Sequence, residues 1–168
     1  RINGPFGYGR KVLAAQLVEF KKLYPHIKLD LILSDTHLDI IKGGFDVAIR
    51  VGTLKDSRLI ARLIKRNKQH LCCSPDYLQK HPITCFLDLS DVDGIIILED
   101  DLTSGTWRLS NGSRQELVKP KTSMQTNNGE VALNWALNGL GVVLRSDWDI
   151  EPYLKTGQLV KVLPQWSV

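Results

Sequence analysis

The pattern of apolar and polar positions predicts strands interleaved with helices, most clearly over residues 29–52. The apolar run 29–33 is typical of a buried strand and stops at Ser34-Asp35. Residues 38–41 predict a brief helical segment closed by Gly43-Gly44, and the apolar run 45–51 predicts a second strand ending at Gly52. These two strands should be parallel, joined by a right-handed crossover. Ser34 then lies at the edge where open α/β sheets bind ligands.

The same alternation continues on both sides of this unit. Residues 1–4 predict a strand, 5–9 a turn, and 13–24 a helix with one apolar face that Pro25 ends. Further strands are expected at 59–64, 70–73, 95–98, 107–109, 117–119, 142–144 and 159–163. Further helices are expected after Ser74-Pro75, after Asn127 with Glu130 in a capping box and Gly139 at the end, and from Asp147 to Leu154. The fold class is therefore α/β.

The bulk composition is that of an ordinary globular chain. It has 168 residues, of which 43% are hydrophobic and 24% charged, enough for one domain or for two small lobes. No apolar run reaches the length of about 18 residues that a membrane helix needs, so no membrane partner is expected. The chain begins at Arg1 within a predicted strand, which suggests a piece of a longer protein.

The net charge of +4 is unevenly distributed. Residues 1–71 hold 14 Lys/Arg against 6 Asp/Glu, a balance of +8, whereas residues 72–168 hold 8 against 12, a balance of −4. The basic half has no basic helix or arginine cluster with interleaved aromatics, so it does not predict a nucleic-acid surface. Lys65, Arg66 and Lys68 indicate a solvated strand edge or attraction of an anionic ligand.

Catalytic, metal and redox chemistry find little support. Cys72, Cys73 and Cys85 lack metal spacing, and the adjacent pair reads as reduced core residues, which fits the cytoplasm. The four histidines have no ligand partners at useful spacing, and there is no nucleophile elbow. The glycines of GPFGYGR fall short of a dinucleotide fingerprint, and Asp100-Asp101 reads as a turn. We expect neither an enzyme nor a bound metal or cofactor.

A binding function fits better, because polar residues gather at the predicted starts of helices. Residues 4–7, Ser34-Asp35, Ser74-Pro75 and Asn127-Asn128 would each present free backbone N–H groups that suit a carboxylate. The competing interpretation is that Ser34, Ser74 and Asn127 only cap their helices, and the sequence leaves both open.

The order of motifs resembles the effector-binding domain of LysR-type transcriptional regulators from Arg1 to Trp166. The most specific matches are FDVAIRVG, DSRLIAR, the CSPDYL helix start and the NGLGVVL return. The resemblance implies a fold like type 2 periplasmic binding proteins, with two α/β lobes around a cleft joined by two hinge strands. It places the first lobe at 1–71, the second at 72–144, a return to the first lobe at 145–168, and the hinge crossings near 69–73 and 142–145.

The resemblance also implies a set of effector contacts in both lobes. They are Pro5, Phe6, Gly7, Ser34, Asp35, Gly52, Thr53, Leu54, Thr103, Ser104, Asn127 and Asn128. In this interpretation Ser34 donates its hydroxyl, the amides near Gly7 and Asn128 hold an anion, and Phe6 and Leu54 pack on its apolar part.

Several features depart from the family pattern. The DNA-binding winged helix-turn-helix expected before Arg1 and the last strand and helix expected after Trp166 are not in the sequence. Arg145-Ser146 stands where relatives commonly have Leu-Pro, and PFGYG lacks the usual Ser or Thr.

The expected function is effector sensing in a bacterial LysR-type regulator. A small organic anion would bind between the lobes and shift their arrangement, and that shift would reach distant DNA-binding domains through a homodimer or tetramer. DNA would be contacted only through the absent N-terminal domain. The alternative is a solute-binding protein of a transport system with the same fold.

Overall fold

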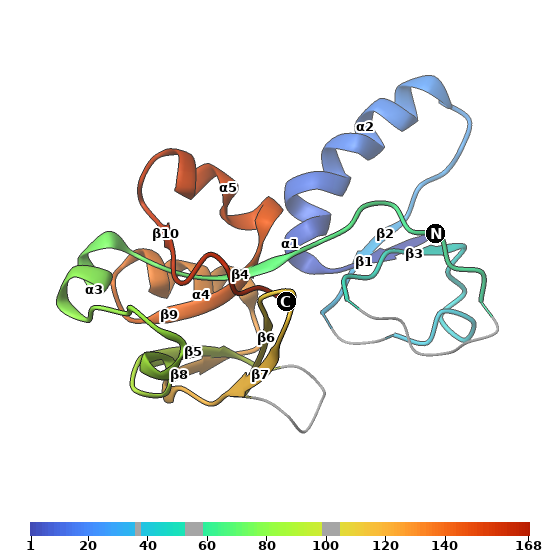
Figure 1. Ribbon diagram of the computed structural model, residues 1–168. Coiled ribbons are helices and arrows are strands. Elements are labelled where there is room, and N and C mark those ends of the chain that lie inside the picture. Colours follow the sequence, from blue (N-terminus) through green and yellow to red (C-terminus); the bar gives the residue numbers. More distant parts are fainter. Residues whose placement is uncertain (36–37, 53–58, 99–104) are drawn as a thin grey trace. The chain divides into compact units, whose positions relative to one another are not determined.

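The computed structural model describes residues 1–35, 38–52, 59–98 and 105–168. Backbone contacts group the chain into two compact units, Arg1–Lys65 and Arg66–Val168 (Figure 1). Residues 145–168 pair and pack within the second of these units. The lobe limits 1–71, 72–144 and 145–168 stay predictions.

The first unit is built on a small parallel sheet. Its elements are β1 (Ile2–Gly4), α1 (Phe6–Tyr8), the π-helical η1 (Gly9–Leu13), α2 (Ala14–Leu23), β2 (Leu31–Leu33) and β3 (Val47–Ala48). The strand order is β2-β1-β3, and β2 and β3 are each parallel to β1. The two strands of the 29–52 unit are therefore parallel, as predicted, with β1 between them.

Three local predictions for the first unit are wrong. Residues 5–9 are not a turn, because helical structure begins at Phe6 and continues through η1 into α2. The described part of 38–44 forms a hydrogen-bonded turn and not a helix. The run Leu59–Ile64 is not a strand, since its backbone is irregular and takes no part in a described sheet, and Ile60 is fully exposed.

The turn before β3 nevertheless ends as a helix would. Gly44 adopts φ +61°. Its N–H donates to the Ile41 carbonyl at 3.1 Å, and the Phe45 N–H donates to the Ile40 carbonyl at 3.0 Å. This is the Schellman pattern, so the glycine closure predicted from the sequence is present on a single turn.

The second unit holds a five-stranded mixed sheet in the order β10-β4-β9-β5-β8. Its strands are β4 (Gln69–Cys73), β5 (Asp93–Ile97), β6 (Trp107–Ser110), β7 (Gln115–Val118), β8 (Lys121–Thr126), β9 (Val142–Ser146) and β10 (Val160–Lys161). Its helices are α3 (Pro75–Lys80), the 3₁₀ turn η2 (Phe86–Ser90), α4 (Gly129–Leu137) and α5 (Asp147–Lys155). Strand β4 is antiparallel to β9 and β10, while β5 is parallel to β8 and β9. Strands β6 and β7 form a separate hairpin.

The core of this unit lies on both faces of the sheet, which the alternation along β4 explains. Leu71 and Cys73 pack with α3, the β6–β7 hairpin and Trp166. Cys72, between them, packs on the opposite face with α4 and α5. All three side chains are fully buried, and the cysteines are free thiols, as predicted for core residues.

Of the three N-caps predicted for the second unit, one is confirmed and two are displaced by one residue. Ser74 caps α3 as predicted, and its hydroxyl accepts from the Tyr77 N–H at 3.2 Å. The cap of α4 is Asn128, one residue later than the predicted Asn127. Ser146 and not Asp147 stands at the N-cap of α5, and makes no side-chain cap bond.

Candidate functional site

The carboxyl ends of the three parallel strands in the first unit meet at one edge of the sheet. Pro5 and Phe6 follow β1, Ser34 and Asp35 follow β2, and Arg50 and Gly52 lie just beyond β3. The Ser34 N–H donates to the Gly4 carbonyl at 2.9 Å, which extends the β1–β2 ladder to this edge. Parallel α/β sheets bind ligands here because helix starts and strand ends converge.

The start of the first helix is already occupied by an acidic side chain. The Phe6 N–H donates to the Asp35 carboxylate at 2.9 Å, while Pro5 at the N-cap has no side-chain cap bond. A carboxylate at a helix start is favourable because the first N–H groups have no partner within the helix. The structure therefore brings together two of the predicted places, 5–7 and Ser34-Asp35. The Asp35 carboxylate thus binds the Phe6 amide, which is one of the amides near Gly7 that were expected to hold an anion.

Asn3 and Arg50 form a polar pair that sequence reasoning missed. Asn3 is fully buried in the central strand, and its amide donates to the Ile32 carbonyl at 2.9 Å. The Arg50 Nη1 donates to the Asn3 Oδ1, and the Arg50 Nη2 donates to the Leu38 carbonyl at 3.4 Å. Burial lowers the pKa of the Arg50 guanidinium. No periodic signal could reveal this pair, since its members are 47 positions apart.

The remaining predicted contacts of the first unit lie at the end of the same sheet. Gly52 is exposed with φ +103°, and a side chain there would meet no described atom within 4 Å. Thr53 and Leu54 lie outside the described residues.

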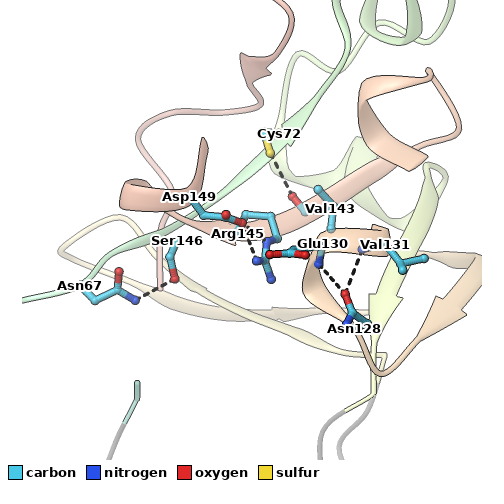
Figure 2. A network of polar contacts seen from close by, with 9 residues as sticks. All are labelled: Asn67, Cys72, Asn128, Glu130, Val131, Val143, Arg145, Ser146 and Asp149. Atoms are coloured by element: carbon cyan, nitrogen blue, oxygen red, sulfur yellow. Dashed lines mark hydrogen bonds and ion pairs between the residues drawn. The ribbon is translucent and has the colours of Figure 1, made fainter. Parts of the chain in front are cut away.

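In the second unit the predicted contacts Asn127 and Asn128 precede α4. The Asn128 Oδ1 accepts from the Glu130 N–H at 2.9 Å and the Val131 N–H at 3.1 Å, so this side chain acts as the helix cap (Figure 2). Asn127 is exposed. Thr103 and Ser104 lie outside the described residues. All twelve predicted contacts stay predictions as ligand contacts.

Arg145, which departs from the family pattern, lies against the start of α4. Its Nε donates to the Asp149 Oδ2 at 2.7 Å, its Nη2 also donates to that oxygen, and the Asp149 side chain is fully buried (Figure 2). A Cβ added to Gly129 would lie 2.2 Å from the Arg145 Nη1. The guanidinium therefore occupies the space that a side chain at the first position of α4 would need.

Both predicted crossings are strands of one sheet, and β4 pairs antiparallel with β9 so that His70 faces Arg145 in register. The His70 Nε2 lies 3.0 Å from the Asp147 Oδ1, which also accepts from the Lys161 Nζ at 3.2 Å. Burial is the main cause of a lowered pKa for His70, and Lys161 and Lys68 act in the same direction. Asp147 and, least of all, the Trp166 backbone act in the opposite direction and favour the charged ring.

Within residues 1–35, 38–52, 59–98 and 105–168, no three His, Cys, Asp or Glu side chains are grouped as a metal site. Among the same residues, no helix is long and apolar enough to cross a bilayer.

Strand ends converge in one α/β unit and a mixed sheet forms the other, which is the architecture of a ligand-binding domain with a type 2 periplasmic-binding-protein-like fold. The model of the LysR substrate binding domain matches residues 1–168, so the chain belongs to that family. The fold class and the family resemblance predicted from the sequence are both confirmed.

Two curated relatives support the same assignment. The chain is 39% identical over 168 residues to the HTH-type transcriptional activator TtdR of Escherichia coli strain K12, covering 99% of this chain and 54% of the relative. It is 36% identical over 167 residues to the HTH-type transcriptional regulator DmlR of the same strain, with coverages of 99% and 54%. The chain thus spans about half the length of these relatives. Both are regulators, which favours sensing over the alternative of a transport protein.

Solved structures agree with the computed fold. The regulatory domain of the C227S variant of AphB from Vibrio vulnificus is 31% identical with a TM-score of 0.82, over 99% of this chain and 85% of that one. The LysR-type regulator CrgA from Neisseria meningitidis is 26% identical with a TM-score of 0.83, over 98% and 55%.

Proposed function

We propose that this chain senses a small organic anion for a bacterial LysR-type transcriptional regulator. The observation that carries the proposal is the family match over all 168 residues. The polar edge of the first unit supports it, since hydroxyl, amide and guanidinium groups gather where parallel strands end.

The chain performs no chemistry in this proposal. The ligand binds one arrangement of the two lobes more tightly than others and so shifts the population, and the shift reaches the DNA-binding part of the whole protein. The effector is held by the predicted contacts of both lobes, from Pro5–Gly7 and Ser34-Asp35 to Asn127-Asn128. Self-association into a dimer or tetramer, DNA contact through a separate domain and residence in the cytoplasm belong to the same proposal.

A thermal-shift screen of small organic acids tests the ligand-sensing step. At least one acid should raise the melting temperature of the chain saturably, and the double substitution Ser34→Ala with Asn127→Ala should abolish the increase. A control pair, Ser113→Ala with Asn134→Ala, removes the same side-chain types from the β6–β7 turn and the middle of α4. An unchanged shift in the first pair contradicts the proposed contacts, and a screen with no saturable shift from any solute contradicts ligand sensing.

A further inference from the structure

Arg50, just beyond the end of β3 in the first unit, is a cation that is not among the predicted effector contacts. Register pairs Asn3 with Ile32 and with Ala48, so these three residues lie on one face. Ser34 and Arg50 follow Ile32 and Ala48 by two positions each and continue on that same face. Ser34 and Arg50 therefore lie on the same face as Asn3, one step nearer to the carboxyl ends of β2 and β3.

The Arg50 guanidinium is held in place by neutral acceptors. Nη1 donates to the Asn3 Oδ1 and to the Ile49 carbonyl at 3.3 Å, and Nη2 donates to the Leu38 carbonyl at 3.4 Å. Asn3 is itself fixed by full burial and by its bond to the Ile32 carbonyl. The arginine is thus oriented before any ligand arrives, which lowers the entropic cost of binding.

No carboxylate among the described residues forms an ion pair with Arg50. Its Nε donates to no described acceptor, although the side chain is only partly exposed. A partly buried charge that has no counter-ion among the described residues is costly, and a methionine of similar length would avoid that cost. Such a cost is typical of a group retained for binding.

The side of the guanidinium that carries Nε and Nη2 has the geometry to bind a carboxylate group. Nε and one hydrogen of Nη2 point the same way and can donate to the two oxygens of one carboxylate. Asp35 follows β2, which is separated from β3 by β1, and its carboxylate already accepts from the Phe6 amide, so it neutralises the first helix start and disfavours a dianionic phosphate. Among the described residues at these strand ends, Arg50 is then a cation that can meet a carboxylate group.

We propose that Arg50, oriented by Asn3, binds a carboxylate group of the effector through its Nε and Nη2 atoms. This inference rests on the proposed sensing function, and it names both the ligand class and the residue that selects it. A structural role, in which Arg50 only ties the turn at Leu38 to the sheet, is the competing outcome.

The test titrates the 168-residue chain with succinate, with neutral succinamide, with inorganic phosphate and with sodium chloride at matched ionic strength. Succinate alone should raise the melting temperature saturably and shift the Arg50 Nε–H resonance. Arg50→Met should abolish both effects, and Arg50→Lys, which keeps the charge without the planar fork, should weaken binding by about tenfold. Arg108→Met removes an exposed arginine of β6 and should bind succinate as the unaltered chain does.

The outcomes separate the two proposals. Equal succinate binding by Arg50→Met and the unaltered chain overturns the role of Arg50 and leaves ligand sensing intact. Stronger stabilisation by phosphate or succinamide than by succinate overturns the carboxylate assignment. If Arg50→Met fails to fold, the titration of the unaltered chain decides, because a purely structural arginine predicts that succinate leaves the Arg50 Nε–H resonance unmoved.

Discussion

Arg145 and Asp149 form an ion pair in which two guanidinium nitrogens donate to one carboxylate oxygen; the carboxylate is fully buried and the Arg145 side chain is 14% exposed. The pair links the end of β9 to the first turn of α5. A second pair with the same four-residue spacing, Glu151 with Lys155, lies on the outer surface of α5. Their different exposure predicts very different contributions to stability.

Asp149→Asn should lower the free energy of unfolding by about 3–5 kcal/mol, because it leaves Arg145 charged and without its counter-ion. Glu151→Gln is the matched control and should cost less than about 0.5 kcal/mol. Urea denaturation of both variants measures the difference. Similar losses for the two would contradict the distinction between the buried and the surface pair.

The effect of Gly129→Ala on the free energy of unfolding should change sign when Arg145 is removed. Alanine normally stabilises a helix position relative to glycine by about 0.5–1 kcal/mol. Here the new Cβ would lie 2.2 Å from the Arg145 Nη1, which Asp149 holds in place, so Gly129→Ala should destabilise the chain. In a background with Arg145→Ala and Asp149→Ala, the same change should become neutral or stabilising. A double-mutant cycle by urea denaturation measures this coupling, and additive effects would contradict it.

Local chemistry allowed much of this fold to be predicted from the sequence. Ser74 with Pro75 predicted the start of α3, and the apolar runs predicted β4, β5 and β9 because buried strands need continuous apolar residues. The run that predicted β2 also forms a strand, but that strand is only partly buried. The cap of α4 was misplaced by one residue, since Asn127 and Asn128 are equally good caps and only the backbone conformation distinguishes them. The Leu59–Ile64 run failed because a strand requires a paired neighbour, which apolar composition does not supply.

The candidate site was less predictable than the fold. Ser34-Asp35 could be located because its position after a strand is a local feature. Asn3 and Arg50 could not, because their contact joins strands 47 positions apart and neither residue is unusual in its own segment. Arg145 stands out in the sequence only as a departure from relatives. Its contact with Asp149 depends on how β9 leads into α5, which no local pattern indicates.

The three cysteines should react very unequally in the folded chain. Burial raises the pKa of Cys72 and of Cys73 to about 12, so both remain thiols at neutral pH, whereas Cys85 is exposed. The thiolate is the reactive form. Iodoacetamide should therefore modify Cys85 alone in the native chain and all three cysteines in urea, as intact-mass spectrometry would show. Native labelling of Cys72 or Cys73 would contradict their burial.

His70 lies on β4, one of the two strands predicted as hinge crossings, and should make the stability of the chain depend on pH. Its Nδ1 is buried and makes no hydrogen bond of regular geometry with the described residues, although the Trp166 backbone favours the charged ring to a small extent. Its Nε2 shares the Asp147 Oδ1 with Lys161, so protonation would add a charge to a buried ring close to a lysine. This agrees with the lowered pKa of His70, whose chief cause is burial.

The sign of the effect follows from linkage. The unfolded chain takes up a proton at this histidine near pH 6.5, while the folded chain does so only at lower pH. Stability contributed by neutral His70 is therefore fully present above about pH 6.5 and is lost as pH falls toward the folded pKa, with a slope of up to about 1.4 kcal/mol per pH unit. His70→Gln keeps a polar side chain without the titration and should reduce that slope in urea denaturation series. A nuclear magnetic resonance titration that gave the folded His70 ring a pKa at or above 6.5 would refute this account, because the lowered value is what couples its burial to stability.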